Sequence, residues 1–214
     1  MRLKYIKDAK EQMANAKDMV IDVPRDGAVN LNQNVPEGMP IGLEIGAGKG
    51  QFIHQISLRH KNTFYFAFEK FDSAIIKALH KCIESPRSNL LLVRADAQNI
   101  REFFTPHTVD TIYLNFSDPW PKARHEKRRL TNPHFLTQYQ TILKPEGCII
   151  LKTDNRHFFE YSLMQMNDVM TFELVSLDLH ADQDEDNIVT EFEQKHAPYG
   201  PIYKIIAKFK EDKQ

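Results

Sequence analysis

The chain has 214 residues, 42% of them hydrophobic, which is enough for one well-filled domain and short for two. Its net charge of −1 excludes a global excess of positive charge, so any affinity for nucleic acid has to come from a local patch. Cys82 and Cys148 lie far apart with no Cys/His cluster, which excludes a disulfide framework and a zinc site. We expect one domain with two buried thiols and no metal.

Residues 1–40 are predicted to form a helical arm followed by a loop, ahead of a main domain at 41–214. The helical stripe comprises Leu3, Ile6, Lys10, Met13 and Lys17. Prolines and glycines then break the pattern between Pro24 and Pro40. No signal-peptide apolar region and no run of 18 apolar residues is present, so we expect a soluble cytoplasmic protein without membrane contact.

From Ile41 onward, short apolar runs alternate with stretches of helical spacing. Strands are predicted at 41–45, 64–68, 90–94, 110–115 and 147–153. Helices are predicted at 50–60, 71–84, 98–104, 132–143 and 155–168. This alternation favours an α/β fold with a parallel sheet covered on both faces. Residues 172–177 and 202–209 alternate in the manner of antiparallel strands, which places an antiparallel strand at the C-terminal end of the sheet.

A glycine-rich loop follows the first of these strands. Gly46, Gly48 and Gly50 permit a tight turn and a close approach of the backbone to a ligand, and the loop opens a helix. The third glycine comes one residue earlier than in the dinucleotide-binding pattern, and Glu44 stands just before the loop. A carboxylate there suits a cationic ligand better than a pyrophosphate.

Carboxylates also follow the second and third strands. Glu69 ends the second strand nineteen residues after Gly50, where ribose hydroxyls could donate to it, and Asp96 closes the third. With Glu44, these acids are predicted to line the crevice where open α/β sheets bind ligands. S-adenosylmethionine, which combines a ribose, an adenine and a positive sulfonium, fits this pattern. The alternative is that they are strand-end carboxylates satisfied by helix N-termini.

The fourth strand leads into Asp118-Pro119-Trp120-Pro121. Each proline fixes φ and restricts its predecessor, so the backbone after Asp118 is held nearly rigid. A strand-four tetrapeptide of Asn, Asp or Ser followed by two prolines and an aromatic marks enzymes that methylate planar amino nitrogens. The corner here, with one proline before the aromatic, points to another type of nitrogen.

A basic stretch comes next, with five cations in eight residues and Glu126 as the only opposing charge: Lys122, Arg124, Lys127, Arg128 and Arg129. Such a patch would supply several phosphate contacts and a salt-dependent affinity. Trp120 could stack on a base, although packing in the core is the favoured interpretation for the tryptophan alone.

Polar groups follow the fifth strand in Lys152-Thr153-Asp154-Asn155, where Asp154 or Asn155 could simply cap the next helix. The segment from Asp178 to Glu193 has seven acids and no Lys or Arg. Thr190 and Glu193 would share a face of a helix, and Glu193 could accept from the N–H groups of a guanine. A solvated acidic helix start is the competing interpretation.

The chain closely resembles bacterial tRNA (guanine-N7)-methyltransferases from about Ile41 to the C-terminus. The motifs that carry the resemblance are Tyr-Leu-Asn-Phe-Ser-Asp-Pro-Trp-Pro-Lys-x-Arg-His-x-Lys-Arg-Arg-Leu at 113–130, Lys-Thr-Asp-Asn at 152–155 and Thr-Glu-Phe-Glu at 190–193. This family is of class I, uses S-adenosylmethionine, and modifies guanine 46 in the tRNA variable loop. The resemblance implies a Rossmann-like fold with a mostly parallel seven-stranded sheet.

The resemblance also assigns roles residue by residue. It implies that the cofactor is bound by Glu44, Gly46, Gly48, Glu69, Asp96 and Asp118. It makes Asp118 catalytic as well. Substrate contacts are implied for Lys122, Asp154, Thr190 and Glu193. Contacts with tRNA are implied for Arg124, His125, Lys127, Arg128 and Arg129.

Two departures from the family are visible. Phe192 replaces the usual tyrosine and loses its hydroxyl, and the arm lacks the Lys-Pro-Trp-Ala often found near the start. Two rival functions remain at this point: methylation of an exocyclic amine of another RNA or of a protein, and a non-enzymatic RNA-binding module with a Rossmann-like fold. A monomer and a homodimer are both compatible with the sequence.

Overall fold

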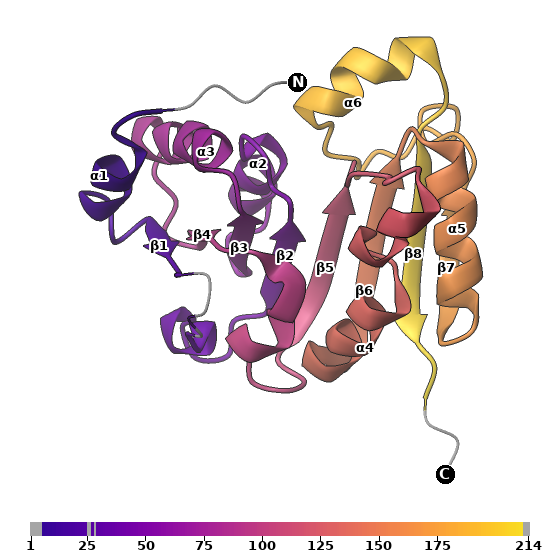
Figure 1. Cartoon of the computed structure of the whole chain (residues 1–214), viewed down its shortest axis with the longest axis horizontal. Coiled ribbons are helices and arrows are strands. Elements are labelled where there is room, and N and C mark those ends of the chain that lie inside the picture. Colours follow the sequence, from indigo (N-terminus) through magenta and orange to yellow (C-terminus); the bar gives the residue numbers. More distant parts are fainter. Residues whose placement is uncertain (1–5, 25–26, 28, 212–214) are drawn as a thin grey trace. The chain divides into compact units, whose positions relative to one another are not determined.

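The structure is a computed structural model that describes residues 6–24, 27 and 29–211. The chain divides into two compact units, one ending at Thr105 and the other beginning at Pro106. Each unit contributes four strands (Figure 1).

The first unit is built around a parallel sheet with the strand order β1-β4-β3-β2. Its elements are α1 (Ala9–Ala14), β1 (Val20–Asp22), η1 (Leu31–Asn34), β2 (Ile41–Ile45), α2 (Gln51–Arg59), β3 (Phe64–Glu69), α3 (Asp72–Glu84), β4 (Leu90–Arg94) and η2 (Ala97–Phe103). Every residue of β2 and β3 is buried, as expected for parallel strands covered on both faces. The predicted strands and the helices α2 and α3 are confirmed.

The N-terminal arm differs from its prediction. The helix α1 has only six residues, and Val20–Asp22 form the unpredicted strand β1, which pairs with Leu92–Arg94. Three residues are too few for alternation to be visible in a sequence, so the edge pairing with β4 decides their conformation. The predicted position of Leu3 lies outside the described residues. With β1, the described residues contain eight strands, one more than predicted.

The second unit has the strand order β5-β6-β8-β7. Its elements are β5 (Val109–Asn115), η3 (Ala123–Arg128), α4 (Pro133–Ile142), β6 (Leu143–Thr153), α5 (Arg156–Asn167), β7 (Met170–Ser176), α6 (Glu191–His196), η4 (Ala197–Tyr199) and β8 (Tyr203–Phe209). The pair β5–β6 is parallel, whereas β8 lies antiparallel to both β6 and β7. The antiparallel C-terminal part of the sheet is confirmed. Figure 1 shows α6 beyond the carboxyl ends of β5 and β6.

The strand β6 begins at Leu143, four residues before the predicted start at Gly147. A Cβ atom on Gly147 would meet the carbonyl oxygen of Asp110 at 3.1 Å and Cδ2 of Leu143 at 2.9 Å. The glycine therefore allows a close backbone approach beside β5, inside a strand that was predicted to begin only at this residue.

Both cysteines are free thiols, and the predicted burial is confirmed for Cys82 but is only partial for Cys148. Cys82 is buried on α3, where burial raises its pKa to about 11, and burial also raises the pKa of the half-buried Cys148 on β6. A protonated, enclosed thiol is a packing group with little nucleophilic character.

Candidate functional site

The glycine loop of the first unit is tied to the neighbouring strand by its backbone. The N–H groups of Gly46 and Ala47 both donate to the carbonyl oxygen of Phe68 at the end of β3, each at 2.9 Å. Gly46 and Gly48 have φ values of +81° and +58°, in the left-handed region that favours glycine. Among the described residues, no atom lies within 4 Å of a Cβ built on either glycine. The loop thus leaves room for a ligand to approach its backbone closely.

Gly50 has a different structural role in the same loop. Its φ is +72°, and a Cβ there would lie 2.7 Å from Cβ of Ala78 on α3. This distance is shorter than real Cβ contacts, so Gly50 permits close packing of α2 against α3. Of the three glycines in the motif, two face open space and one serves helix packing.

Glu44 and Glu69 are buried at the carboxyl ends of β2 and β3, with exposed fractions of 3% and 8%. The Oε2 atom of Glu69 accepts from the N–H of Gly48, and Oε1 accepts from the N–H of Phe71, both at 2.9 Å. Burial raises the pKa of Glu69, while these N–H donors partly oppose the rise. Glu69 therefore braces the glycine loop, and its carboxylate retains acceptor sites beyond the two bonds.

Asp96 is exposed and caps η2, because its Oδ1 accepts from the N–H of Gln98 at 3.1 Å. Glu69 and Asp96 thus accept from local N–H groups, as the competing interpretation of the strand-end acids predicts. The same unit also contains the open face of the glycine loop. This combination suits a small ligand with hydroxyl groups to donate and a cationic centre.

In the second unit, Asp118 is exposed at the corner that follows β5. Trp120 is half-buried and packs against the η3 helix: the ring of His125 lies edge-on at 5.6 Å, and the guanidinium of Arg128 lies 4.8 Å from the indole centre. The predicted core packing of Trp120 is only partial. The corner and the basic stretch form one local structure.

The cations of the basic stretch fall into two groups. The exposed ones are Lys122, Arg124, Lys127 and Arg128. Arg129 is half-buried and donates to backbone carbonyls of the corner, at Pro119 and Trp120. The short helix η3 was not predicted, because turns of 3₁₀ helix carry no apolar periodicity.

A buried ion pair joins the last residues of β6 to the start of α6. Lys152, whose side chain is 3% exposed, donates from Nζ to Oε2 of Glu193 at 2.7 Å, to the carbonyl oxygen of Ile188 at 2.9 Å and to Oδ1 of Asn187 at 3.0 Å. No separate role for Lys152 was predicted from the sequence. The available signal was a lysine directly after the apolar run Ile149–Leu151 in a central strand, where a cation needs a buried partner.

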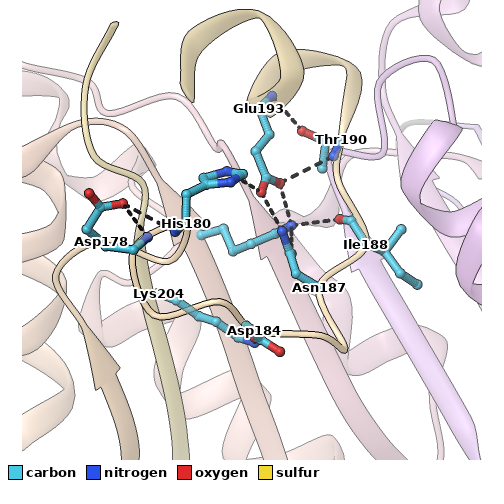
Figure 2. Close-up of polar contacts among 10 residues, drawn as sticks. Asp178, His180, Asp184, Asn187, Ile188, Thr190, Glu193 and Lys204 are labelled. Carbon is cyan, nitrogen blue, oxygen red and sulfur yellow. Dashed lines mark hydrogen bonds and ion pairs between the residues drawn. The ribbon is translucent and has the colours of Figure 1, made fainter. Parts of the chain in front are cut away.

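Glu193 is fully buried, and it forms a capping box with Thr190 at the start of α6 (Figure 2). The hydroxyl of Thr190 accepts from the N–H of Glu193 at 2.9 Å, and Oε2 of Glu193 accepts from the N–H of Thr190 at 3.3 Å. Oε1 accepts from Nδ2 of Asn187 at 2.6 Å and lies 3.1 Å from Nε2 of His180. The acidic helix start is thus buried and internally bonded, and the contact of Thr190 and Glu193 with a base stays a prediction.

Asn155 caps α5, because its Oδ1 accepts from the N–H of Phe158 at 2.9 Å. The capping alternative therefore applies to Asn155, and Asp154 is left partly exposed with Oδ2 3.7 Å from Nδ1 of His196. The His196 ring stacks on Phe192 with ring centres 3.9 Å apart. Phe192, the departure from the usual tyrosine, thus contributes a flat face beside the acid.

The chain is similar in sequence to known methyltransferases. The family model Methyltransf_4, described as "Putative methyltransferase", matches residues 38–204. A tRNA (guanine-N(7)-)-methyltransferase of Lactiplantibacillus plantarum is 47% identical over 211 residues, which cover 98% of this chain and 99% of that protein. Another from Listeria monocytogenes serotype 4b is 45% identical, with 98% and 99% covered. The chain belongs to the tRNA (guanine-N7)-methyltransferase family.

Solved structures with low sequence identity share the fold. An antibiotic-related methyltransferase is 17% identical, with a TM-score of 0.63 and coverage of 90% of this chain and 96% of that chain. A SAM-dependent methyltransferase from Aquifex aeolicus is 15% identical, with a TM-score of 0.57 and coverage of 83% and 86%. These matches establish the Rossmann-like methyltransferase fold of this family member.

The similarity to these relatives covers more of the chain than the predicted range from Ile41 to the C-terminus. The relatives align with nearly the full chain, including most of the N-terminal arm. In the described ranges, no cluster of three or more His, Cys, Asp or Glu residues could hold a metal ion. A search of the same ranges finds no helix that is both long and apolar enough to cross a membrane.

Proposed function

We propose that this protein is a tRNA (guanine(46)-N7)-methyltransferase that uses S-adenosylmethionine as its methyl donor. The observation that carries the proposal is the 47% identity to a tRNA (guanine-N(7)-)-methyltransferase over 98% of the chain. The open glycine loop, with buried carboxylates beside it, is an argument for S-adenosylmethionine as the cofactor. The proposed substrate places the reaction in the cytoplasm.

The first unit supplies the groups that would hold the cofactor. The backbone at Gly46 and Gly48 is open to close approach, and Glu69 braces it from the adjacent strand end. Glu44 adds a second buried carboxylate, and Asp96 offers an exposed one. When bound, S-adenosylmethionine supplies an electrophilic methyl group on its sulfonium. Acids around this loop match a cationic ligand better than a phosphate.

The chemistry of guanine N7 decides the role of Asp118. This nitrogen has an in-plane lone pair and no proton, so no residue has to act as a base before methyl transfer. Asp118 instead orients the guanine and stabilises the positive charge that moves onto the purine ring. Alignment of the reacting groups supplies most of the acceleration.

The second unit also supplies the groups for recognition of the RNA. Four residues are proposed to recognise the guanine: Lys122, Asp154, Thr190 and Glu193. Of these, Thr190 and Glu193 are buried and set the position of α6. The exposed cations with His125 are proposed for the tRNA backbone: Arg124, Lys127 and Arg128.

Methyl transfer from labelled cofactor to an unmodified tRNA transcript tests the function. A matched transcript with its variable-loop guanine replaced should lose the signal. Cleavage with aniline after reduction should map the methyl group to N7, and methylation of an exocyclic amine would contradict the proposal. A chain without S-adenosylmethionine affinity in calorimetry would not be an enzyme of this class.

Asp118→Asn tests the role of the carboxylate. Single-turnover methyl transfer at saturating tRNA and cofactor should slow by roughly 10²–10³, the range seen when one electrostatic group is removed from an active site. Retention of the wild-type rate would show that Asp118 has no such role.

A further inference from the structure

The corner after β5 holds two bulky residues in left-handed backbone conformations. Phe116 has a φ of +51° and Trp120 a φ of +41°. A left-handed conformation at such residues costs about 1–3 kcal/mol and persists only where the surrounding structure enforces it. Trp120 also precedes Pro121, which restricts its backbone further. Some group close to Trp120 has to hold this conformation in place.

Arg129 is that group. Its Nε donates to the carbonyl oxygens of Pro119 at 3.0 Å and of Trp120 at 3.3 Å, and Nη2 donates to the Trp120 oxygen at 3.1 Å. The planar guanidinium therefore spans two successive carbonyls directly after Asp118. Lysine has a single ammonium on a flexible stem and cannot reproduce this arrangement.

The guanidinium of Arg129 is itself held from α5. Its central carbon lies 4.3 Å from the ring centre of Tyr161. The hydroxyl of Tyr161 accepts from Nδ2 of Asn132, the residue that caps α4, at 3.2 Å. These contacts connect the strained corner to two helices of the second unit, so the corner is fixed to the body of the unit.

Arg129 thus differs from the other arginines of the basic stretch. Arg124 and Arg128 are exposed, whereas Arg129 is half-buried with its Nε and Nη2 donors directed at carbonyl groups. A phosphate contact requires donors that face solvent. All three arginines were predicted to contact RNA, because the sequence shows the charge of a side chain and not the direction in which it points.

We propose that Arg129 is a positioning residue that clamps the Asp118-Pro119-Trp120 corner and thereby sets the place of the Asp118 carboxylate. This inference rests on the proposed methyltransferase function. It removes Arg129 from the set of phosphate contacts. Because the clamp depends on shape, conservation of charge alone should not preserve it.

Arg129→Lys tests the clamp. The variant keeps the charge, so the slope of log Kd for tRNA against log salt should not change. Single-turnover methyl transfer at saturating tRNA and cofactor should fall roughly 10–100-fold, because a displacement of about 1 Å at a reacting group can cost 10² in rate. A phosphate contact predicts the reverse: a retained rate, with a slope reduced by about one only when the charge is removed in Arg129→Gln.

Two further variants keep the test independent of folding. Tyr161→Leu removes the ring under the guanidinium and should lower the same rate, and the double variant Arg129→Lys/Tyr161→Leu should fall little further, because both act on one structure. Arg156→Lys, an exposed substitution elsewhere on α5, should retain the wild-type rate. Thermal unfolding of each variant, compared with the wild type, checks that the second unit is folded.

The outcomes separate the two proposals. A wild-type chain that transfers no methyl group to tRNA refutes the function. An active wild type with Arg129→Lys at the same single-turnover rate refutes the clamp alone. A retained rate in Arg129→Lys together with a salt slope that is shallower by about one in Arg129→Gln would in addition assign Arg129 to a phosphate contact.

Discussion

The two units hold their candidate site residues by different means. In the first unit, the glycine loop presents open backbone at glycines with positive φ, in a loop bonded to the end of β3. In the second, the candidate residues depend on contacts made by buried or half-buried side chains, as in the Lys152–Glu193 pair and the Arg129 guanidinium that holds carbonyl groups of the corner. A backbone site tolerates changes of side chain but not of conformation, whereas a side-chain site fails when one partner is removed.

The largest effect should come from Lys152→Met in the second unit. The substitution leaves a fully buried Glu193 without its cationic partner, and breaking such a pair costs about 3–5 kcal/mol. Urea denaturation should show this loss in the free energy of unfolding. The double variant Lys152→Met/Glu193→Gln should lose less than the sum of the two single variants. Losses below about 1 kcal/mol would mean that the pair is not buried in solution.

In the first unit, two alanine substitutions in one loop should separate packing from ligand approach. Gly50→Ala brings a Cβ to 2.7 Å from Ala78 and strains a positive φ, so it should cost about 2–4 kcal/mol of stability. Gly48→Ala meets no described atom within 4 Å and should cost only about 1–2 kcal/mol, from the φ strain alone. Its main effect should be weaker binding of S-adenosylmethionine in calorimetry. Equal stability losses in both variants would contradict this division.

The ion pair between Lys204 and Asp184 should give the second unit a dependence on pH. The hydrogen bond from Lys204 lowers the pKa of Asp184. A lowered carboxyl pKa gives stability that is fully present above its ordinary value of about 3.9 and is lost as pH falls through the lower folded value. Lys204→Met should remove about 1 kcal/mol at pH 7. The difference between variant and wild type should shrink as pH falls below this ordinary value, and a constant difference would exclude the linkage.

The smallest expected effect distinguishes two neighbours after β6. Asn155→Ala removes the cap of α5 and should cost about 1 kcal/mol. Asp154→Ala should leave the melting temperature nearly unchanged, because Asp154 does not cap the helix and its nearest ionic partner, His196, lies 3.7 Å away. Thermal unfolding of both variants in one buffer measures the contrast, and the reverse order of losses would reassign the cap.

The sequence predicts the strands and longer helices well, because apolar runs such as those of β2 and β3 have no other stable arrangement than burial on both faces. It misses β1, whose three residues acquire their conformation from pairing with β4. Tertiary contacts at the edge of a sheet leave little trace in such a short segment.

For the candidate site, residue types and spacing locate the glycine loop, the acids, the corner and the basic stretch. They do not reveal which way a side chain points. Lys152 turns to a buried acid 41 residues later, and Arg129 turns inward while Arg124 does not. Those directions depend on packing partners from distant parts of the chain, so only the structure provides them.

The position of β8 between β6 and β7 affects how the protein is made. Residues 203–209 are synthesised after β6 and β7, yet they lie between these two strands in the sheet of the second unit. Until they arrive, β6 and β7 each present an unpaired edge, which is a template for wrong pairing. Pairing of β8 with β6 and β7 therefore completes the sheet of the second unit. Chains shortened before Tyr203 should aggregate during synthesis.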